Sequence, residues 1–222
     1  QLILLGDVFD YWFEYATVVQ KHHIRTLAAL AESVDAGIAV EYVIGNHDFG
    51  HRRFFTEELG ITVHTNDVVL QLNGKTIYAG HGDCRGERTT RRARFLRSVL
   101  RNPLALRAWS WLHPDIAIPL AAWVSQQSRL HASNTAMHQE QQNVALFAQQ
   151  KVAEGYDIVV MGHTHVPVLE QLSAPANQHM GIYINTGDWL YHRTFALFDK
   201  DSIMLCTWQQ SHIHCIAAHQ MH

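Results

Sequence analysis

The chain has 222 residues, of which 47% are hydrophobic and 17% are charged, so it can bury the core of one domain or of two small ones, and a disordered tail or a coiled coil is excluded. Its formal charge of −3 excludes the general basic excess of a nucleic-acid binder. Histidine is unusually frequent, with 17 residues, and because neutral imidazole is a common metal ligand, the composition favours a metal site.

The cysteines indicate the redox compartment of the protein, and the start of the chain indicates whether residues precede it. Cys84, Cys206 and Cys215 are too few and too scattered for a disulfide framework or a CxxC zinc site, so we expect them to be incidental and the compartment to be reducing. No apolar stretch is long enough for a transmembrane helix. The chain opens inside an apolar run without an initiator Met, and we expect residues to be missing upstream.

The first part of the chain predicts a strand, a helix and a second, parallel strand. Residues 2–5 and 40–44 are apolar runs typical of buried strands. Between them, apolar residues recur at helical spacing up to a stop at Asp35-Ala36-Gly37, namely Leu27, Leu30, Ala31 and Val34. Parallel strands joined by a helix indicate an α/β fold.

Further strands follow. Residues 68–72 and 76–79 flank Asn73-Gly74-Lys75, which predicts a hairpin. Four more apolar or alternating runs predict strands, at residues 157–161, 181–185, 195–198 and 202–208. Residues 209–222 show no clear period, and we expect a frayed C-terminal tail.

Residues 84–154 differ from the rest and are expected to form an inserted helical cap. From Arg85 to Arg107 the sequence holds eight arginines and one glutamate, a local charge of +7, so the remainder carries −10. Apolar and aromatic residues follow at helical spacing, interrupted by prolines at 114 and 119. An arginine-rich helix most often faces solvent, and apolar and aromatic residues at helical spacing most often belong to a core. Together, the two features also suit the binding of an amphiphilic ligand.

Four apolar strands each end in glycine followed at once by a polar residue. The four pairs are Gly6-Asp7, Gly45-Asn46, Gly80-His81 and Gly162-His163. Ligands of open α/β sheets collect at the carboxyl ends of strands, and glycine lets the backbone turn sharply there. The pattern predicts one functional site at these strand ends.

The residues at these ends form a mixed set of nitrogen and oxygen ligands. The set comprises Asp7, Asn46, His81, His163 and His165. Such a set suits Mn²⁺, Fe²⁺, Co²⁺, Ni²⁺ or Zn²⁺, and a carboxylate can bridge two ions that activate water for phosphoester hydrolysis. A single histidine could equally be a hydrogen-bonded or solvent-facing imidazole, whereas the whole set favours a metal site.

These motifs, in this order, resemble the signature of the calcineurin-like metallophosphoesterases. Within that superfamily, the chain up to about Trp208 is similar to the branch of UDP-2,3-diacylglucosamine pyrophosphohydrolases. The resemblance rests on five segments: Gly6-Asp7-Val8-Phe9-Asp10-Tyr11-Trp12, the hairpin before His81, Arg101-Asn102-Pro103-Leu104, Leu112-His113-Pro114-Asp115 and Asn185-Thr186-Gly187-Asp188-Trp189.

The resemblance implies a dinuclear site, with Mn²⁺ as the expected metal. Asp7 would bridge the two ions, and His165 would serve the first. The second ion would be completed by Asn46, His81 and His163.

The resemblance also implies roles beside the metals. His47 would sit over the phosphate, to stabilise developing charge or to protonate the leaving group. Asp10, Asp48 and Asp83 would orient ligands without binding metal. From the cap, Arg85, Arg129 and Asn134 are candidate substrate contacts.

The expected fold is a four-layer α/β/β/α sandwich over residues 1–208, with the cap at 84–154, a tail at 209–222, and the first strand missing. The family's first Asp-x-His motif should precede Asp7 and is absent from the chain. We therefore expect either a fragment or an impaired first site, with the second metal held better than the first and with slow hydrolysis.

The implied reaction is hydrolysis of the pyrophosphate bond of UDP-2,3-diacylglucosamine, a step of lipid A biosynthesis. A lipid-linked nucleotide substrate implies a peripheral association with the cytoplasmic face of the inner membrane. Two alternatives stay open: a metallophosphoesterase acting on another phosphodiester, a nucleotide or a phosphoprotein, and a non-catalytic scaffold with an incomplete metal site. No nucleic-acid partner is expected, and the oligomeric state is not determined by the sequence.

Overall fold

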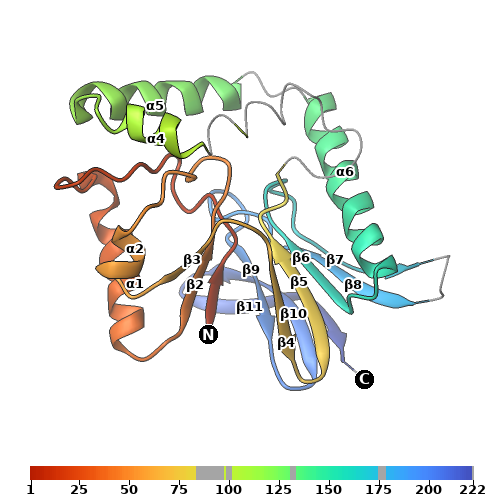
Figure 1. Cartoon of the computed structure of the whole chain (residues 1–222). Coiled ribbons are helices and arrows are strands. Elements are labelled where there is room, and N and C mark those ends of the chain that lie inside the picture. Colours follow the sequence, from red (N-terminus) through yellow and green to blue (C-terminus); the bar gives the residue numbers. More distant parts are fainter. Residues whose placement is uncertain (84–97, 99–101, 131–133, 175–178, 222) are drawn as a thin grey trace. The chain divides into compact units, whose positions relative to one another are not determined.

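The computed structural model describes residues 1–83, 98, 102–130, 134–174 and 179–221 (Figure 1). It is an α/β structure with parallel, mixed and antiparallel sheets. The chain divides into two units, the first drawn from residues 1–66 and 89–133 and the second from residues 67–88 and 134–222.

The first unit consists of a parallel sheet, against which α1 and α2 pack, and of further helices. Its three strands run in the order β1-β2-β3, all parallel. The strands are β1 (Leu2–Leu4), β2 (Val40–Val43) and β3 (Thr62–His64). The helical elements are the 3-10 helix η1 (Lys21–His23), α1 (Ile24–Asp35), α2 (Phe54–Glu57), α4 (Pro103–Trp109) and α5 (Pro114–Leu130).

The predicted strand–helix–strand unit is confirmed by β1, α1 and β2. Leu27 and Leu30 are the buried residues of α1, and they share a core cluster with Val40 and Tyr42 of β2. The helix ends at Asp35, and Gly37 follows with φ +85°, a conformation that glycine adopts without steric cost. Helical spacing therefore directs α1 onto the sheet.

The second unit contains two sheets. A mixed sheet runs in the order β4-β5-β6-β8-β7, with β5, β6 and β8 parallel and β4 and β7 antiparallel at its edges. Its strands are β4 (Val68–Leu72), β5 (Lys75–Gly80), β6 (Ile158–Met161), β7 (Val168–Ser173) and β8 (Met180–Asn185). An antiparallel sheet in the order β11-β10-β9 consists of β9 (Thr194–Phe198), β10 (Ser202–Gln209) and β11 (His212–Gln220).

Helix α6 (Asn134–Ala153) packs against the mixed sheet of the second unit (Figure 1). Its residues Val144, Ala148 and Val152 are fully buried and share a cluster with Val159 and Met161 of β6. A cap over residues 84–154 stays a prediction. Within that range, α4 and α5 belong to the first unit, whereas α6 contributes to the core of the second.

The expectation of a frayed tail is wrong. Residues 212–220 form β11, which pairs antiparallel with β10 along its length. Nearly every residue of β11 is exposed, so the strand lacks the alternation of burial by which sequence reasoning finds strands. The backbone hydrogen bonds to β10 form all the same, because every residue supplies a donor and an acceptor regardless of side chain.

Candidate metal centre

In the first unit, the loops after β1 and β2 carry Asp7 and Asn46. Because β1 and β2 are parallel neighbours, these loops leave the same edge of the sheet. Asp7 Oδ1 accepts a hydrogen bond of 2.8 Å from the backbone N–H of His47. A Cβ atom at Gly45 would lie 2.1 Å from that same oxygen, so the approach of the two loops requires glycine there.

Asp48 joins these two loops. Its side chain is fully buried, and Oδ1 accepts from the Gly45 N–H at 2.7 Å while Oδ2 accepts from the Val8 N–H at 2.9 Å. The Tyr42 hydroxyl also donates to Oδ2. Burial, and then the adjacent Asp48, raise the pKa of Tyr42 well above its ordinary value, so the phenol stays a donor. Asp48 thus holds the backbone on which Asp7 and Asn46 are mounted.

The imidazole of His47 has partners from two segments of the first unit. Its Nδ1 lies 3.1 Å from the carbonyl oxygen of Asp10 and 3.2 Å from Oγ of Ser125 on α5. Asp10 therefore contributes its backbone to the site, while the residue itself is exposed. A carbonyl acceptor favours the tautomer with the proton on Nδ1, leaving Nε2 free of that proton.

In the second unit, the ends of β5 and β6 bring His81 and His163 together. The two strands are parallel neighbours with Gly80 opposite Met161, and the Gly162 N–H donates to the His81 carbonyl at 3.0 Å. Nδ1 of His163 lies 3.2 Å from Nε2 of His81, close enough for both to serve one metal ion. Two nitrogens, each about 2.1 Å from a shared ion, are separated by about 3.0–3.4 Å, so the pair fits a divalent metal.

His163 and His165 also face carboxylates of the second unit. Nε2 of His163 lies 3.5 Å from Glu140 Oε1 on α6, and Nδ1 of His165 lies 3.9 Å from Asp188 Oδ2. Burial raises the pKa of Asp188, but hydrogen bonds from the Tyr191 amide and from His192 outweigh it and leave the pKa below its ordinary value. Asp188 is therefore an ionised carboxylate beside His165.

Asn185, at the end of β8, supports the histidine loop from beneath. Its side chain is fully buried, and Nδ2 donates to the Gly162 carbonyl at 2.7 Å, one residue before His163. Its Oδ1 accepts from the Gly187 N–H at 3.1 Å, in the loop that leads to Asp188. One amide thus connects the loop of His163 and His165 with the loop of Asp188.

The backbone at three of the predicted ligands is strained. Among the described residues, seven that are not glycine have positive φ, and three of these are Asp7 at 53°, His163 at 65° and His165 at 60°. The left-handed region is uncommon for residues other than glycine, and such outliers cluster at functional sites. The strain is an indication of function that does not depend on residue type.

The remaining predicted site residues fall as follows. Asp83 is buried, at 2% exposure, directly after the His81 loop. Arg85 lies outside the described residues, and so do the side chains of Arg129 and Asn134, whose backbones belong to α5 and α6. The contact of these three with a substrate stays a prediction.

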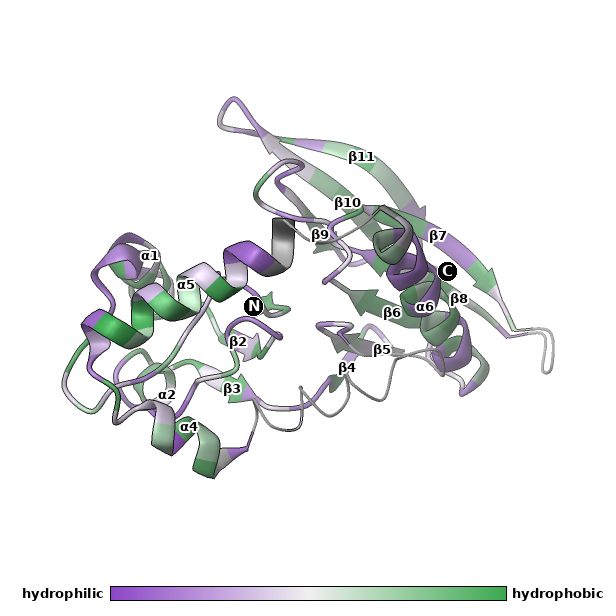
Figure 2. Ribbon diagram, turned by 90° about the horizontal axis from the view of Figure 1, so that it is seen from above, coloured by the Kyte–Doolittle hydropathy of each residue, from purple (hydrophilic) through white to green (hydrophobic). Residues whose placement is uncertain are grey.

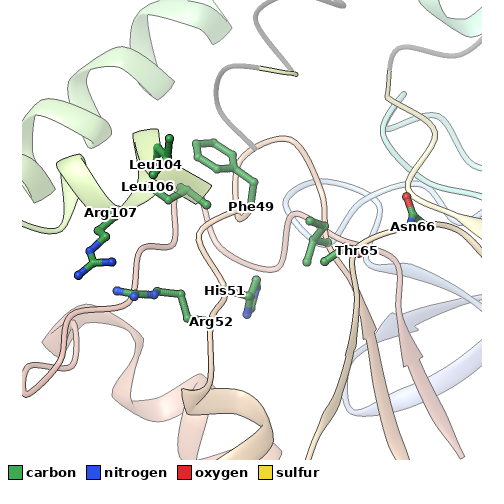
Figure 3. A pocket seen from close by; sticks show the side chains of 9 residues that line it. Phe49, His51, Arg52, Thr65, Asn66, Leu104, Leu106 and Arg107 are labelled. Atoms are coloured by element: carbon green, nitrogen blue, oxygen red, sulfur yellow. The ribbon is translucent and has the colours of Figure 1, made fainter. Parts of the chain in front are cut away.

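A cavity of about 580 Å³ lies in the first unit (Figure 3). Arg52 and Arg107 lie toward one end of it, and Thr65 and Asn66 toward the other (Figure 3). The rest of the lining is mostly apolar, from Ile44, Phe49, Leu104 and Leu106, with the imidazole of His51. Guanidinium groups beside apolar side chains suit a ligand that carries both negative charge and hydrocarbon.

Sequence reasoning missed several contributors to these surroundings. Ser125 and Glu140 were not predicted near the site histidines at all. Asn185 and Asp188 were singled out as part of segment 185–189, but their contacts with the site histidines or their loops were not predicted. Asn185 gave a usable signal, because it ends a buried strand as the four glycine pairs do. Ser125 and Glu140 lie on helices far from the motifs in sequence, and nothing local marks them.

Comparison with known proteins gives a consistent result. A family model described as calcineurin-like phosphoesterase matches residues 1–167. A UDP-2,3-diacylglucosamine hydrolase of Porphyromonas gingivalis is 30% identical, over 92% of this chain and 82% of that protein. Proteins of the same name from Xanthomonas oryzae pv. oryzae and Edwardsiella ictaluri are 28% and 27% identical, over 92% of this chain and 84% and 78% of theirs.

Solved structures give weaker matches. Vacuolar protein sorting 29 from Cryptosporidium parvum is 16% identical with a TM-score of 0.40, covering 98% of this chain and 84% of that one. Vps29 from Entamoeba histolytica, complexed with zinc, is 12% identical with a TM-score of 0.39, covering 99% and 97%.

Proposed function

The chain belongs to the calcineurin-like phosphoesterase family, and from this premise we propose that it hydrolyses the pyrophosphate bond of UDP-2,3-diacylglucosamine to UMP and 2,3-diacylglucosamine 1-phosphate. The observation that carries the metal-dependent part is the 3.2 Å separation of the His81 and His163 nitrogens at neighbouring strand ends. The substrate is supported by relatives of that name that match 92% of the chain.

The proposed site holds two divalent ions, with Mn²⁺ as the first candidate and Fe²⁺, Co²⁺, Ni²⁺ or Zn²⁺ as others. The proposed ligands are Asp7, Asn46, His81, His163 and His165. The proposal keeps the four-layer α/β/β/α sandwich that the resemblance to the family implies. When bound, the ions would polarise the phosphoryl oxygen and lower the pKa of the attacking water.

In this proposal the side chains of the protein position the metal ligands and stabilise the charge that develops on the phosphate. His47 faces the phosphate, either as an electrostatic clamp or as the acid that protonates the leaving group. Its Nδ1 is engaged by Asp10 and Ser125, so Nε2 is the atom available to the substrate, and either role requires the imidazolium form, in which Nε2 also carries a proton. Asp48 and Asn185 hold the ligand loops, and Asp188 orients His165.

The lipid part of the substrate is supported by the first unit. Arg52 and Arg107 beside Phe49 and Leu104 can receive an anionic group next to hydrocarbon. An apolar row on α5 is also exposed, with Ile116 at 62%, Leu120 at 40% and Trp123 at 58% (Figure 2). No helix among the described residues has the length and hydropathy to cross a bilayer. We propose that this row rests in the interface at the cytoplasmic face of the inner membrane.

The test is hydrolysis of UDP-2,3-diacylglucosamine and of bis-p-nitrophenyl phosphate with Mn²⁺ added, with a His81→Ala, His163→Ala variant as the metal control. We expect release of UMP that EDTA and the double variant abolish, and a preference for the diacylated substrate over UDP-glucose. Turnover of bis-p-nitrophenyl phosphate without that preference would favour another phosphodiester. No turnover of any substrate by a chain that binds Mn²⁺ would favour a scaffold.

A further inference from the structure

Strands β10 and β11 place two cysteines opposite each other. Cys206 on β10 is the direct register partner of Cys215 on β11. The register of the two strands shifts at a bulge between Leu205 and Cys206, directly beside this pair. Both thiols are free. The pairing depends on β11, a strand that the sequence did not predict, and joins two cysteines that are nine positions apart in the chain.

The geometry of this pair suits a disulfide bond. Directly opposed residues of antiparallel strands have Cα atoms about 4.5–5.5 Å apart and side chains on the same face. A disulfide needs Cα atoms separated by about 4.4–6.8 Å. The neighbouring Cys215 thiol also contributes to the raised pKa of Cys206, in keeping with this register. The register therefore places the two cysteines at a separation typical of disulfide bonds.

The two thiols differ in access. Cys215 is exposed, and its Sγ lies 3.3 Å from the Ala217 carbonyl oxygen, whereas Cys206 is 1% exposed. Burial, followed by the neighbouring Cys215, raises the pKa of Cys206. An external oxidant therefore meets Cys215 first, and Cys206 is reached only through it.

We propose that Cys206 and Cys215 form a redox-active thiol pair, which a small disulfide such as oxidised glutathione converts to an intrachain disulfide. The Cys215 thiolate attacks one sulfur of oxidised glutathione, forming a mixed disulfide and releasing one glutathione thiolate. The Cys206 thiolate then attacks the Cys215 sulfur and releases the second. The two cysteines lose two electrons and two protons, and oxidised glutathione gains them.

The product would fasten β11 to the sheet. The disulfide closes a loop of residues 206–215 and links a mostly exposed edge strand to β10, whose residues at 203, 205 and 206 are buried. Cross-links stabilise mainly by restricting the unfolded chain. The oxidised protein should therefore have a higher midpoint of thermal unfolding than the reduced one.

The test uses the whole chain, reduced and then incubated with oxidised glutathione. No Lys or Arg occurs between Asp201 and His222, so trypsin leaves both cysteines in one peptide, while chymotrypsin can cut between them at Trp208. We expect the titratable thiols to fall from three to one. The chymotryptic fragments that contain Cys206 and Cys215 should remain linked until a reductant is added.

Three variants serve as controls. Cys84→Ser should still lose two thiols. Cys215→Ser should lose both the link and the rise in thermal midpoint, and Cys206→Ser should trap glutathione on Cys215. If the Cys206→Ser variant does not fold, the peptide map of the unaltered chain still shows whether Cys206 and Cys215 are linked. The proposal would be overturned by a disulfide that involves Cys84 or that joins two chains. It would also be overturned if Cys215 of the unaltered chain kept glutathione and formed no disulfide with Cys206.

Discussion

The buried amide of Asn185 donates a 2.7 Å hydrogen bond to the carbonyl oxygen of Gly162, the residue that precedes His163. This bond ties the end of β8 to the loop after β6, while the other side of the same amide accepts from Gly187. The strained backbone at His163 and His165 is therefore held by a side chain that would not touch the metal itself.

The first prediction follows from this bond. Asn185→Ala removes the donor to Gly162 and the acceptor for Gly187, so the proposed ligands His163 and His165 lose their fixed orientation. We expect affinity for Mn²⁺ to fall by about 10- to 100-fold, as for other groups that orient metal ligands. Calorimetric titration measures the effect, with Gln171→Ala, an exposed residue of neighbouring β7, as control. Equal affinity in both variants would contradict the role.

His47 is predicted to act in catalysis and not in metal binding. His47→Ala should keep its metal content and lose turnover by about 100- to 1000-fold, the usual loss when one stabilising group is removed. Ser125→Ala should lose less, because the Asp10 carbonyl still engages Nδ1. Metal analysis beside steady-state kinetics separates these effects. A His47→Ala variant that turns over normally, or that loses metal, would refute the assignment.

Asp48 is predicted to be essential for stability even without metal. In Asp48→Asn one carboxylate oxygen becomes an NH₂ group, which faces a backbone N–H that it cannot accept from. We expect the free energy of unfolding to fall by about 1–3 kcal/mol, the cost of a buried unpaired polar group. Urea unfolding in EDTA measures it, with the exposed Asp201→Asn as the matched control. If the two variants unfold alike, the buried carboxylate does not hold the loops.

The apolar row of α5, together with Trp111 in the segment between α4 and α5, gives a prediction about membranes. Trp111 and Trp123 are 83% and 58% exposed. Replacing both by Ser should lower binding to anionic vesicles by about tenfold or more, from the apolar area lost, and leave thermal stability unchanged. Trp189→Ser, which removes a tryptophan that is 62% exposed in the second unit, is the control. Vesicle co-sedimentation measures binding, and an equal loss in the control would mean that general hydrophobicity is responsible.

Much of the local structure could be predicted because local patterns specify it. Alternation and helical spacing marked β1, α1, β2, the β4–β5 hairpin and strands β6, β8, β9 and β10. The exposed β11 carried no such pattern, and the three-residue β3 and the edge strand β7 were not predicted either. At the site, strand-end motifs identified ligand candidates, whereas Ser125 and Glu140 depend on how distant helices pack.

His51 gives a prediction about pH. Burial lowers its pKa from 6.5 to about 3, and both ring nitrogens lack a hydrogen-bond partner within the described structure. Its ring packs on Tyr42 and Phe55, with centroids 4.5 Å away in each case. The imidazole is therefore neutral in the folded chain at a pH where the unfolded chain begins to bind a proton.

The sign follows from this difference. Between pH 6.5 and 3 the unfolded state binds more protons at His51 than the folded state, so the stability present above pH 6.5 is lost as the pH falls. The slope from this one group reaches about 1.4 kcal/mol per pH unit. Urea unfolding between about pH 6.5 and 5 separates this slope from the titration of ordinary carboxylates, and the His51→Leu variant separates it from that of His23, whose pKa burial also lowers. His51→Leu should flatten the slope, and His212→Leu, at an exposed histidine of the second unit, should leave it unchanged. Equal slopes in all three proteins would show that His51 is hydrated.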